Sequence, residues 1–230
     1  MRLKRILLGV AIGIAAAAAS ILLLTQTLGN MRPTVVHGQT LGGWAAQVNA
    51  ADASASNQAN AILNAEIIPQ LTQVMFHDTN DSSARMALID ILNGLPGISI
   101  PYADAPQRRA AAAYDLGSFG SAARAAVPSL IQALQGNDPE VHANAIKSLG
   151  AIHSEPEVVI PLLTKYLDDN QLNDEAAMAL GDFGSLARPA IPKIIPLLRA
   201  ADKDARVAAA KALKQIDPAA YASATNTPAK

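Results

Sequence analysis

The sequence predicts an all-α protein, an α–α superhelix of about four helical hairpins that follows an N-terminal transmembrane or signal helix. Three observations predict this class. The 230 residues include 48 alanines but only eight aromatic residues, and alanine favours helices and disfavours strands. A motif recurs with a period near 32 residues, and a long apolar run follows a basic amino terminus. Cysteine is absent, which excludes a disulfide framework.

The apolar run predicts a membrane helix outside the repeat fold. Arg2, Lys4 and Arg5 precede residues 6–24, a run of nineteen residues without a charge that would reach roughly 28 Å as a helix. A basic end before such a run stays in the cytoplasm. We therefore expect a single-pass inner-membrane protein whose repeat domain is periplasmic. The alternative is a cleaved signal and a secreted or periplasmic protein. It is less favoured because the small residues 15–20 lie inside the run.

The repeat is visible by comparing the sequence with itself. Residues 116–128 read LGSFGSAARAAVP and residues 180–192 read LGDFGSLARPAIP, with nine of thirteen positions identical. Residues 149–161 lie halfway between them and keep the Leu-Gly pair, the serine and the final proline. A period of this length is typical of stacked helical hairpins.

The first helix of each unit is predicted from positions that precede the repeat leucines. These leucines are Leu116, Leu149, Leu180 and Leu213, and small or aliphatic residues stand three and four positions before each. That spacing forms one face of a helix. The glycines that follow, Gly117, Gly150 and Gly181, are predicted to end the helix in a left-handed conformation. Phe119, Ile152, Phe183 and Ile216 are predicted to fill the bend before the second helix.

The second helix of each unit is predicted to open at a proline, which fits the first turn because its missing N–H has no partner there. These prolines are Pro69, Pro128, Pro161 and Pro192. Pro196 falls inside such a helix and is expected to kink it or delay its start. The first pair is irregular. Ile89 and Leu92 match the register, but residues 93–106 leave room only for a loop or a very short helix.

These observations divide the chain into four predicted segments. Residues 1–30 form the signal anchor or signal peptide, and residues 31–57 form a linker and short lead-in. Residues 58–217 form the repeat domain, and residues 218–230 form a flexible tail.

The pattern resembles the HEAT repeat, and more closely the short bacterial version known from phycobilin-lyase-like proteins. The matching features are the Leu-Gly ending, the Val/Ile-Pro opening and an arginine seven residues before the leucine, at Arg85, Arg109 and Arg206. The resemblance implies that an aspartate ahead of this arginine ties adjacent repeats together. Asp81 fits beside Arg85, and Asp202 or Asp204 beside Arg206, whereas His142 and Asn173 replace the arginine in two units. The segment GQTLGGW, residues 38–44, is similar to a lead-in of exported repeat proteins.

Catalytic, cofactor-binding and metal-binding residues are not evident in the sequence, and we expect a protein that is not an enzyme. The histidines His37, His77, His142 and His153 form no pair at metal-ligand spacing. Residues 31–230 carry 15 basic and 19 acidic residues, a balance that argues against nucleic acid as a partner. No small-molecule substrate is evident either.

Arg124 and Arg188 occupy the same repeat position and allow two interpretations. They could bind an anion together, or each could bond helix-end carbonyls in its own turn. Recurrence in the repeat register favours the structural interpretation.

The second helices of such arrays usually line the concave face, and a partner protein is expected there. Gln73, Gln132 and Lys165 each stand four residues after a helix-opening proline, and Tyr166 follows Lys165. These four are the predicted partner-binding residues. The sequence thus predicts a scaffold or adaptor of the bacterial cell envelope that binds another protein. The alternative, which rests on the resemblance, is a chromophore-lyase-like or chaperone-like HEAT protein.

Overall fold

The computed structural model describes residues 35–79, 87, 91 and 103–226. The chain divides into two compact units, residues 1–31 with 79–105 and residues 32–78 with 106–230. The predicted membrane segment lies outside the described residues. So do Asp81, Arg85, Ile89, Leu92 and most of the connector 93–106. In the part of the chain that is described, no helix is both long and apolar enough to cross a membrane.

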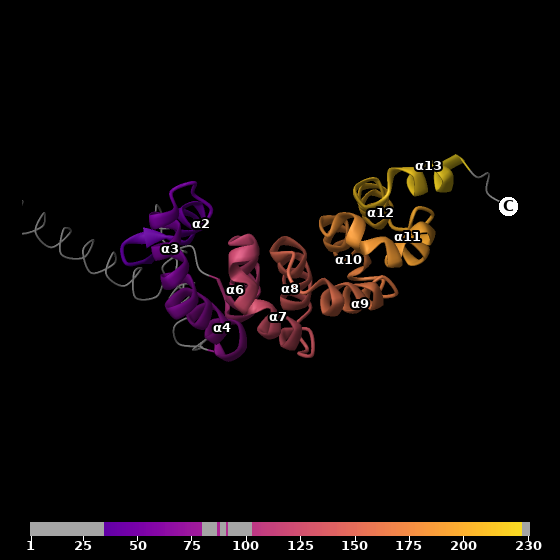
Figure 1. Ribbon diagram of the computed structural model, residues 1–230. Coiled ribbons are helices and arrows are strands. Elements are labelled where there is room, and N and C mark those ends of the chain that lie inside the picture. The colour runs from indigo at the N-terminus through magenta and orange to yellow at the C-terminus, as the bar shows by residue number, and fades with distance from the viewer. Residues whose placement is uncertain (1–34, 80–86, 88–90, 92–102, 227–230) are drawn as a thin grey trace, which may run out of the picture. The chain divides into compact units, whose positions relative to one another are not determined.

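The described chain is almost entirely helical (Figure 1). The helices are α2 (Leu41–Val48), α3 (Ala53–Ile62), α4 (Ile68–His77), α6 (Ala105–Gly117), α7 (Val127–Ala133), α8 (Pro139–Ile152), α9 (Pro156–Tyr166), α10 (Asn173–Asp182), α11 (Ile191–Leu197), α12 (Lys203–Ile216) and α13 (Pro218–Asn226). A π-helical turn, η1 (Leu63–Ile67), joins α3 to α4. Two 3-10 segments, η2 (Gly120–Ala126) and η3 (Gly184–Ala190), lead into α7 and α11.

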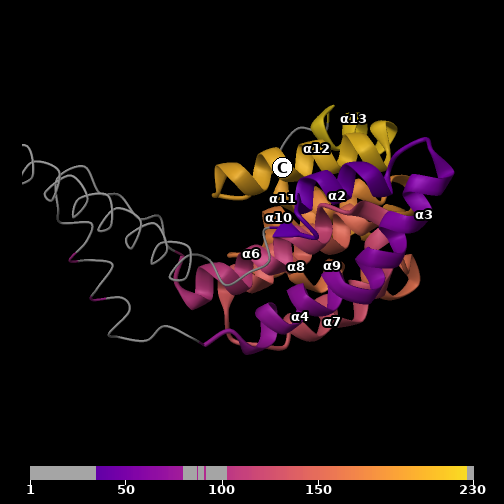
Figure 2. The same ribbon diagram turned by 90° about the vertical axis from the view of Figure 1, so that its left-hand side faces the viewer.

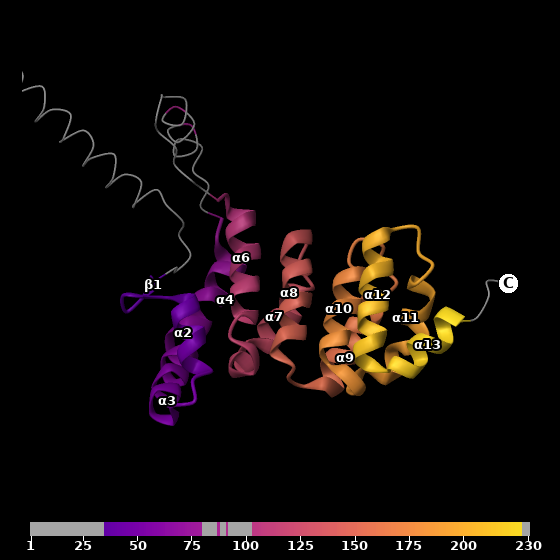
Figure 3. The ribbon, with the colours of Figure 1, turned by 90° about the horizontal axis from the view of Figure 1, so that it is seen from above.

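The helices form stacked hairpins, which confirms the predicted all-α repeat architecture. The first helices α6, α8, α10 and α12 follow one another side by side (Figure 3). The second helices α7, α9 and α11 pack against α8, α10 and α12, respectively, and α4 lies beside α7 (Figure 2). Each hairpin covers the apolar face of its neighbour, as stacked repeats require.

A small lead-in precedes the first long helices. Strands β1 (Val35–Val36) and β2 (Gln39–Thr40) pair antiparallel, and the Thr40 side chain caps α2 by accepting from Gly43 N. The buried Trp44 of α2 donates from Nε1 to the Val36 carbonyl at 2.9 Å. The indole thereby holds the hairpin against α2 in the segment predicted as linker and lead-in. At the other end, α13 lies within residues 218–230, for which the sequence predicts a tail.

The repeat leucines and the bend-filling residues form the core. Leu116, Leu149, Leu180 and Leu213 are fully buried, and Phe119, Ile152, Phe183 and Ile216 are buried beside them. Burial of one such side chain contributes about 1.5–3 kcal/mol. Both sets confirm the expected register.

The Leu-Gly glycines have a different role from the one predicted. The prediction of left-handed helix ends at Gly117, Gly150 and Gly181 is wrong, because none of the three has a positive φ. Helix α6 does end at Gly117, but α8 continues beyond Gly150 and α10 beyond Gly181. Within the described helical repeats, the glycines with positive φ are instead Gly120 and Gly184, where η2 and η3 begin.

Close packing of first helices explains the Leu-Gly glycines. A Cβ atom on Gly150 would lie 2.7 Å from Ala179 Cα, and one on Gly117 would lie 2.8 Å from Ser148 Cα. Real Cβ atoms do not approach backbone so closely. The missing side chain therefore allows each first helix to touch the next one.

The prolines agree with the prediction in three second helices. Pro69, Pro128 and Pro192 lie in the first turns of α4, α7 and α11. The prediction for Pro161 is wrong, because α9 begins at Pro156 and encloses Pro161 in its interior. Pro196 does not delay α11, which begins at Ile191; it lies one residue before the end of that helix.

Candidate partner-binding groove

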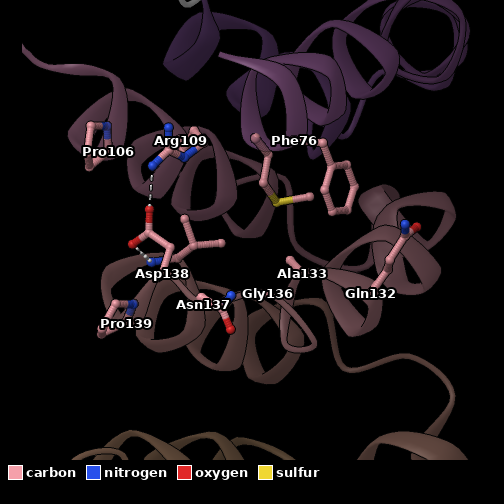
Figure 4. A pocket seen from close by; sticks show the side chains of 11 residues that line it. Phe76, Pro106, Arg109, Gln132, Ala133, Gly136, Asn137, Asp138 and Pro139 are labelled. Carbon is pink, nitrogen blue, oxygen red and sulfur yellow. Dashed lines mark hydrogen bonds and ion pairs between the residues drawn. The ribbon is translucent and has the colours of Figure 1, made fainter. Parts of the chain in front are cut away.

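A cavity of about 530 Å³ opens between α4, α7 and the first turns of α6 and α8 (Figure 4). We call it the partner groove. Its lining residues are Met75, Phe76, Pro106, Arg109, Gln132, Ala133, Gly136, Asn137, Asp138, Pro139 and Val141. Figure 4 shows Phe76 and Gln132 at one end, and Arg109 with Asp138 near the two prolines at the other.

The charged end of the partner groove is already engaged in hydrogen bonds. Arg109 Nη1 donates to the Asp78 carbonyl at 2.7 Å, and Nη2 donates to Asp138 Oδ2 at 2.9 Å. Asp138 also caps α8 through Oδ1, which accepts from the backbone N–H groups of Glu140 and Val141. The two charges therefore neutralise each other and fix the start of α8 against α6.

In two other units, the residue at the repeat position of Arg109 bonds a carbonyl of the turn that precedes its own helix. His142 donates from Nε2 to the Gly136 carbonyl at 3.0 Å. Arg206 donates from Nη1 to the carbonyls of Ala200 and Ala201, each at 2.7 Å. Side-chain donors near a helix C-terminus satisfy carbonyls that lack a partner.

The expected pairing of Arg206 with Asp202 or Asp204 is therefore replaced by carbonyl contacts. Asp202 instead caps α12 by accepting from Ala205 N at 2.9 Å. This hydrogen bond is the main cause that lowers the pKa of Asp202. Asn173, which replaces the arginine in another unit, is buried at the start of α10.

A buried ion pair lies behind the partner groove and was not predicted from the sequence. Arg108 donates from Nε to Asp78 Oδ2 at 2.6 Å and from Nη2 to Oδ1 at 2.8 Å. The Arg108 side chain is 1% exposed and that of Asp78 is 5% exposed. Two parallel bonds of this kind are among the strongest side-chain contacts. The only available signal was the Arg108-Arg109 pair in one helix, because Asp78 is thirty residues away in the sequence.

One of the four predicted partner-binding residues lines the partner groove. Gln132 is exposed on α7 and forms part of the lining, whereas Gln73 is exposed on α4 and lies outside the lining. Lys165 is exposed on α9. Tyr166 is half-buried and donates to the Leu134 carbonyl at 3.3 Å. Burial, and to a lesser degree Asp169, raises the pKa of Tyr166.

The recurring arginines Arg124 and Arg188 have a third role that neither interpretation anticipated. Arg124 Nε lies 3.6 Å from Glu155 Oε1, and Arg188 Nε lies 3.4 Å from Asp217 Oδ2. Each acid immediately precedes the next α9 or α13 helix. Both arginines are largely exposed, so each pair contributes little stability. They tie one hairpin to the following one.

The titratable groups of the described residues form no metal-binding cluster. Within residues 35–79 and 103–226, no three His, Cys, Asp or Glu side chains are placed to hold a metal ion. His37 pairs with Glu66 at 2.9 Å. His153 contacts the Ala151 and Asp182 carbonyls at 2.9 and 2.7 Å.

Comparisons with known proteins found one family match and a similar solved structure. Residues 98–180 match the family model of HEAT repeats, and the chain thus contains HEAT repeats. The solved complex of CpcE and CpcF of phycocyanin lyase from Nostoc sp. PCC7120 is similar. Its sequence identity is 26%, its TM-score is 0.45, and the match covers 80% of this chain and 68% of that one. No curated protein matches the sequence.

Proposed function

We propose that the protein is a non-catalytic interaction module, a scaffold or adaptor of the bacterial cell envelope, that docks a partner protein in the partner groove. The observation that carries the proposal is the chemistry of the lining. Met75, Phe76, Ala133 and Val141 make the wall largely apolar. Concave apolar surfaces with few polar groups are typical of binding sites.

The polar groups of the partner groove favour a protein over a charged small molecule. Arg109 and Asp138 bond to each other, so a charged ligand would have to break that pair. The exposed amides of Gln132 and Asn137 lie along the lining and offer donors and acceptors to a peptide backbone. An aliphatic or aromatic side chain of the partner would fill the apolar part.

A matched pair of glutamine substitutions tests this docking site. Gln132→Arg places a bulky charge at the lining, whereas Gln135→Arg places it three residues away at an exposed position outside the lining. Partner proteins recovered with the full-length chain from detergent-solubilised membranes would be quantified by mass spectrometry. We expect Gln132→Arg to reduce recovery of the principal partner about tenfold and Gln135→Arg to preserve it. Equal recovery by both variants would contradict the proposal.

The envelope location is supported by the sequence of residues 1–30. The charge-free run 6–24 after three basic residues is the pattern of a membrane helix whose amino end stays inside. Fractionation of cells that produce the chain with and without residues 1–30 tests it. The full chain should pellet with membranes and be degraded by protease added to spheroplasts, and the shortened chain should do neither. Membrane association without residues 1–30 would overturn this part of the proposal.

A further inference from the structure

A second cavity, of about 390 Å³, opens on the layer of first helices, between α8, α10 and α12. We call it the acidic groove. Its charged lining includes Asp174, Glu175, Asp182 and Asp204, and its apolar lining includes Met178 and Val207. None of these residues lines the partner groove. The two grooves are therefore separate surfaces.

We propose that the acidic groove binds a basic and apolar segment of a partner protein, in which a lysine or arginine stands next to a large aliphatic residue. The proposal is independent of what occupies the partner groove. It rests on the charge, the exposed apolar surface and an unsatisfied carboxylate oxygen of the acidic groove.

The charge of the acidic groove selects a cation. Four carboxyl groups line it with one amine, that of Lys147. Lys147 Nζ lies 3.4 Å from Glu175 Oε1, so this lysine is already shared with one acid. Among the described residues, neither Asp174 nor Asp204 forms an ion pair. An arriving ammonium or guanidinium group would therefore meet carboxylates that lack a cation.

Glu175 supplies a second and independent observation. Its side chain is 16% exposed. Its Oε2 atom is buried and has no hydrogen-bond partner. A buried acceptor without a donor is costly. If the Glu175 carboxylate turned toward the acidic groove, a guanidinium or ammonium group of the partner would provide the missing donor.

The apolar part of the acidic groove is the reason why we expect a large aliphatic residue beside the lysine or arginine of the bound segment. Val207 is 58% exposed on α12, and Met178 is half-buried on α10. An aliphatic side chain laid over them would remove apolar surface from water. A phosphate backbone would be repelled by the four acids, and no metal-binding trio exists among the described side chains. A protein segment is thus the fitting class of ligand.

Two acids of the acidic groove, Glu175 and Asp182, should make ligand binding depend on pH. Burial raises the pKa of Glu175, as does the neighbouring Asp174, whereas Lys147 lowers it. Burial also raises the pKa of Asp182, whereas His153 and Lys211 lower it. A cationic ligand needs these carboxyl groups ionised. Its affinity should therefore rise as the pH increases through their pKa values.

A peptide selection tests the proposal directly. A phage-displayed library of random heptapeptides would be selected on the full-length chain at neutral pH, and the enriched peptides would be synthesised with a fluorescent label. We expect enriched sequences that place lysine or arginine beside leucine, isoleucine, valine or methionine. Enrichment of acidic or uncharged sequences, or no enrichment, would overturn the proposal.

Matched variants then assign the binding to this groove. Asp174→Asn with Asp204→Asn should raise the dissociation constant of the enriched peptide at least about fivefold, and Val207→Ser should also raise it. The control, Glu140→Gln with Glu157→Gln, removes the same charge at exposed positions outside the acidic groove and should leave the constant within about twofold.

Two further outcomes decide the proposal. Equal weakening by the control and by the Asp174→Asn/Asp204→Asn variant would show attraction by net charge alone and would overturn it, as would affinity that falls from pH 5 to pH 7.5. Gln132→Arg should leave peptide binding unchanged, because it lies in the other groove. An experiment that contradicts the proposal for the partner groove can thus be distinguished from one that contradicts the proposal for the acidic groove.

Discussion

Individual residues in the Leu-Gly pair decide how closely two repeats approach. The glycine recurs at Gly117, Gly150 and Gly181, and in each case the missing Cβ is replaced by an atom of the next first helix. Ser148 adds a polar contact at the same level, because its Oγ donates to the Ala113 carbonyl at 2.7 Å. The recurrence of the glycine was visible in the sequence. The structural reason for the recurrence was not visible. A glycine that ends a helix and a glycine that contacts a neighbouring helix look the same in a sequence.

Gly150→Ala should destabilise the protein by about 1–3 kcal/mol, because the added methyl group would lie 2.7 Å from the Ala179 Cα backbone atom and overpack the interface. The free energy of unfolding from urea titration measures it. Gly42→Ala is the matched control, since nothing lies within 4 Å of its added Cβ; it should be neutral or stabilise by up to about 1 kcal/mol. Equal effects at both glycines would refute the packing explanation.

Asp78→Asn should destabilise the protein by about 3–5 kcal/mol, because it leaves the buried Arg108 guanidinium without its carboxylate. The double variant Asp78→Leu/Arg108→Met removes both charges and should lose clearly less stability than the sum of the losses of Asp78→Leu and Arg108→Met. A double-mutant cycle by chemical denaturation measures the difference. Additive losses would mean that the two side chains do not act as a pair.

The titration of the Asp182 carboxyl should make the stability of the folded protein depend on pH. Asp182→Asn should abolish this contribution. Burial raises the pKa of Asp182 in the folded protein. The stabilising effect of the neutral carboxyl is fully present below the ordinary aspartate pKa of about 4 and is lost as the pH rises through the higher folded-state value. As the pH rises from 3, the melting temperature of Asp182→Asn should therefore increase relative to that of the wild type. A shift toward the wild type would contradict the direction of the pKa change.

At the scale of the helix, proline has two different effects in the second helices. Pro128 lies in the first turn of α7, where no N–H partner is lost, whereas Pro161 lies in the interior of α9. The sequence placed both at a helix start because both follow the same repeat motif. Pro156, five residues earlier, is an equally good first-turn residue and begins α9. Local sequence could not choose between two prolines that each fit a helix start.

The same substitution at these two prolines should have opposite effects. Pro161→Ala should stabilise by about 1–2 kcal/mol, because it restores a helical N–H and removes the clash of the proline ring with the preceding turn. Pro128→Ala should destabilise by about 0.4–1 kcal/mol, because it only adds freedom to the unfolded chain. Thermal and urea unfolding measure both. Effects of the same sign would show that the α9 proline is not strained.

At the scale of the whole chain, the periodicity predicted the fold far better than it predicted the site. The register identified the buried leucines, the bend-filling residues and Gln132 of the partner groove. The groove itself combines Gln132 with Phe76 and Arg109, which come from two other parts of the chain. A sequence of one protein carries no signal that these three side chains meet. Tyr166 shows the converse, since the residue predicted for a partner donates to a carbonyl of its own chain.

The proposed function requires a partner protein that contacts the partner groove. The most direct measurement is a photo-crosslinking amino acid at position 132, produced in the full-length chain in living cells, beside the same amino acid at Val158. Val158 is 54% exposed and lies outside the partner and acidic grooves. We expect one dominant crosslinked protein from position 132 that is absent from position 158. Identical crosslinks from both positions, or none from position 132, would contradict it.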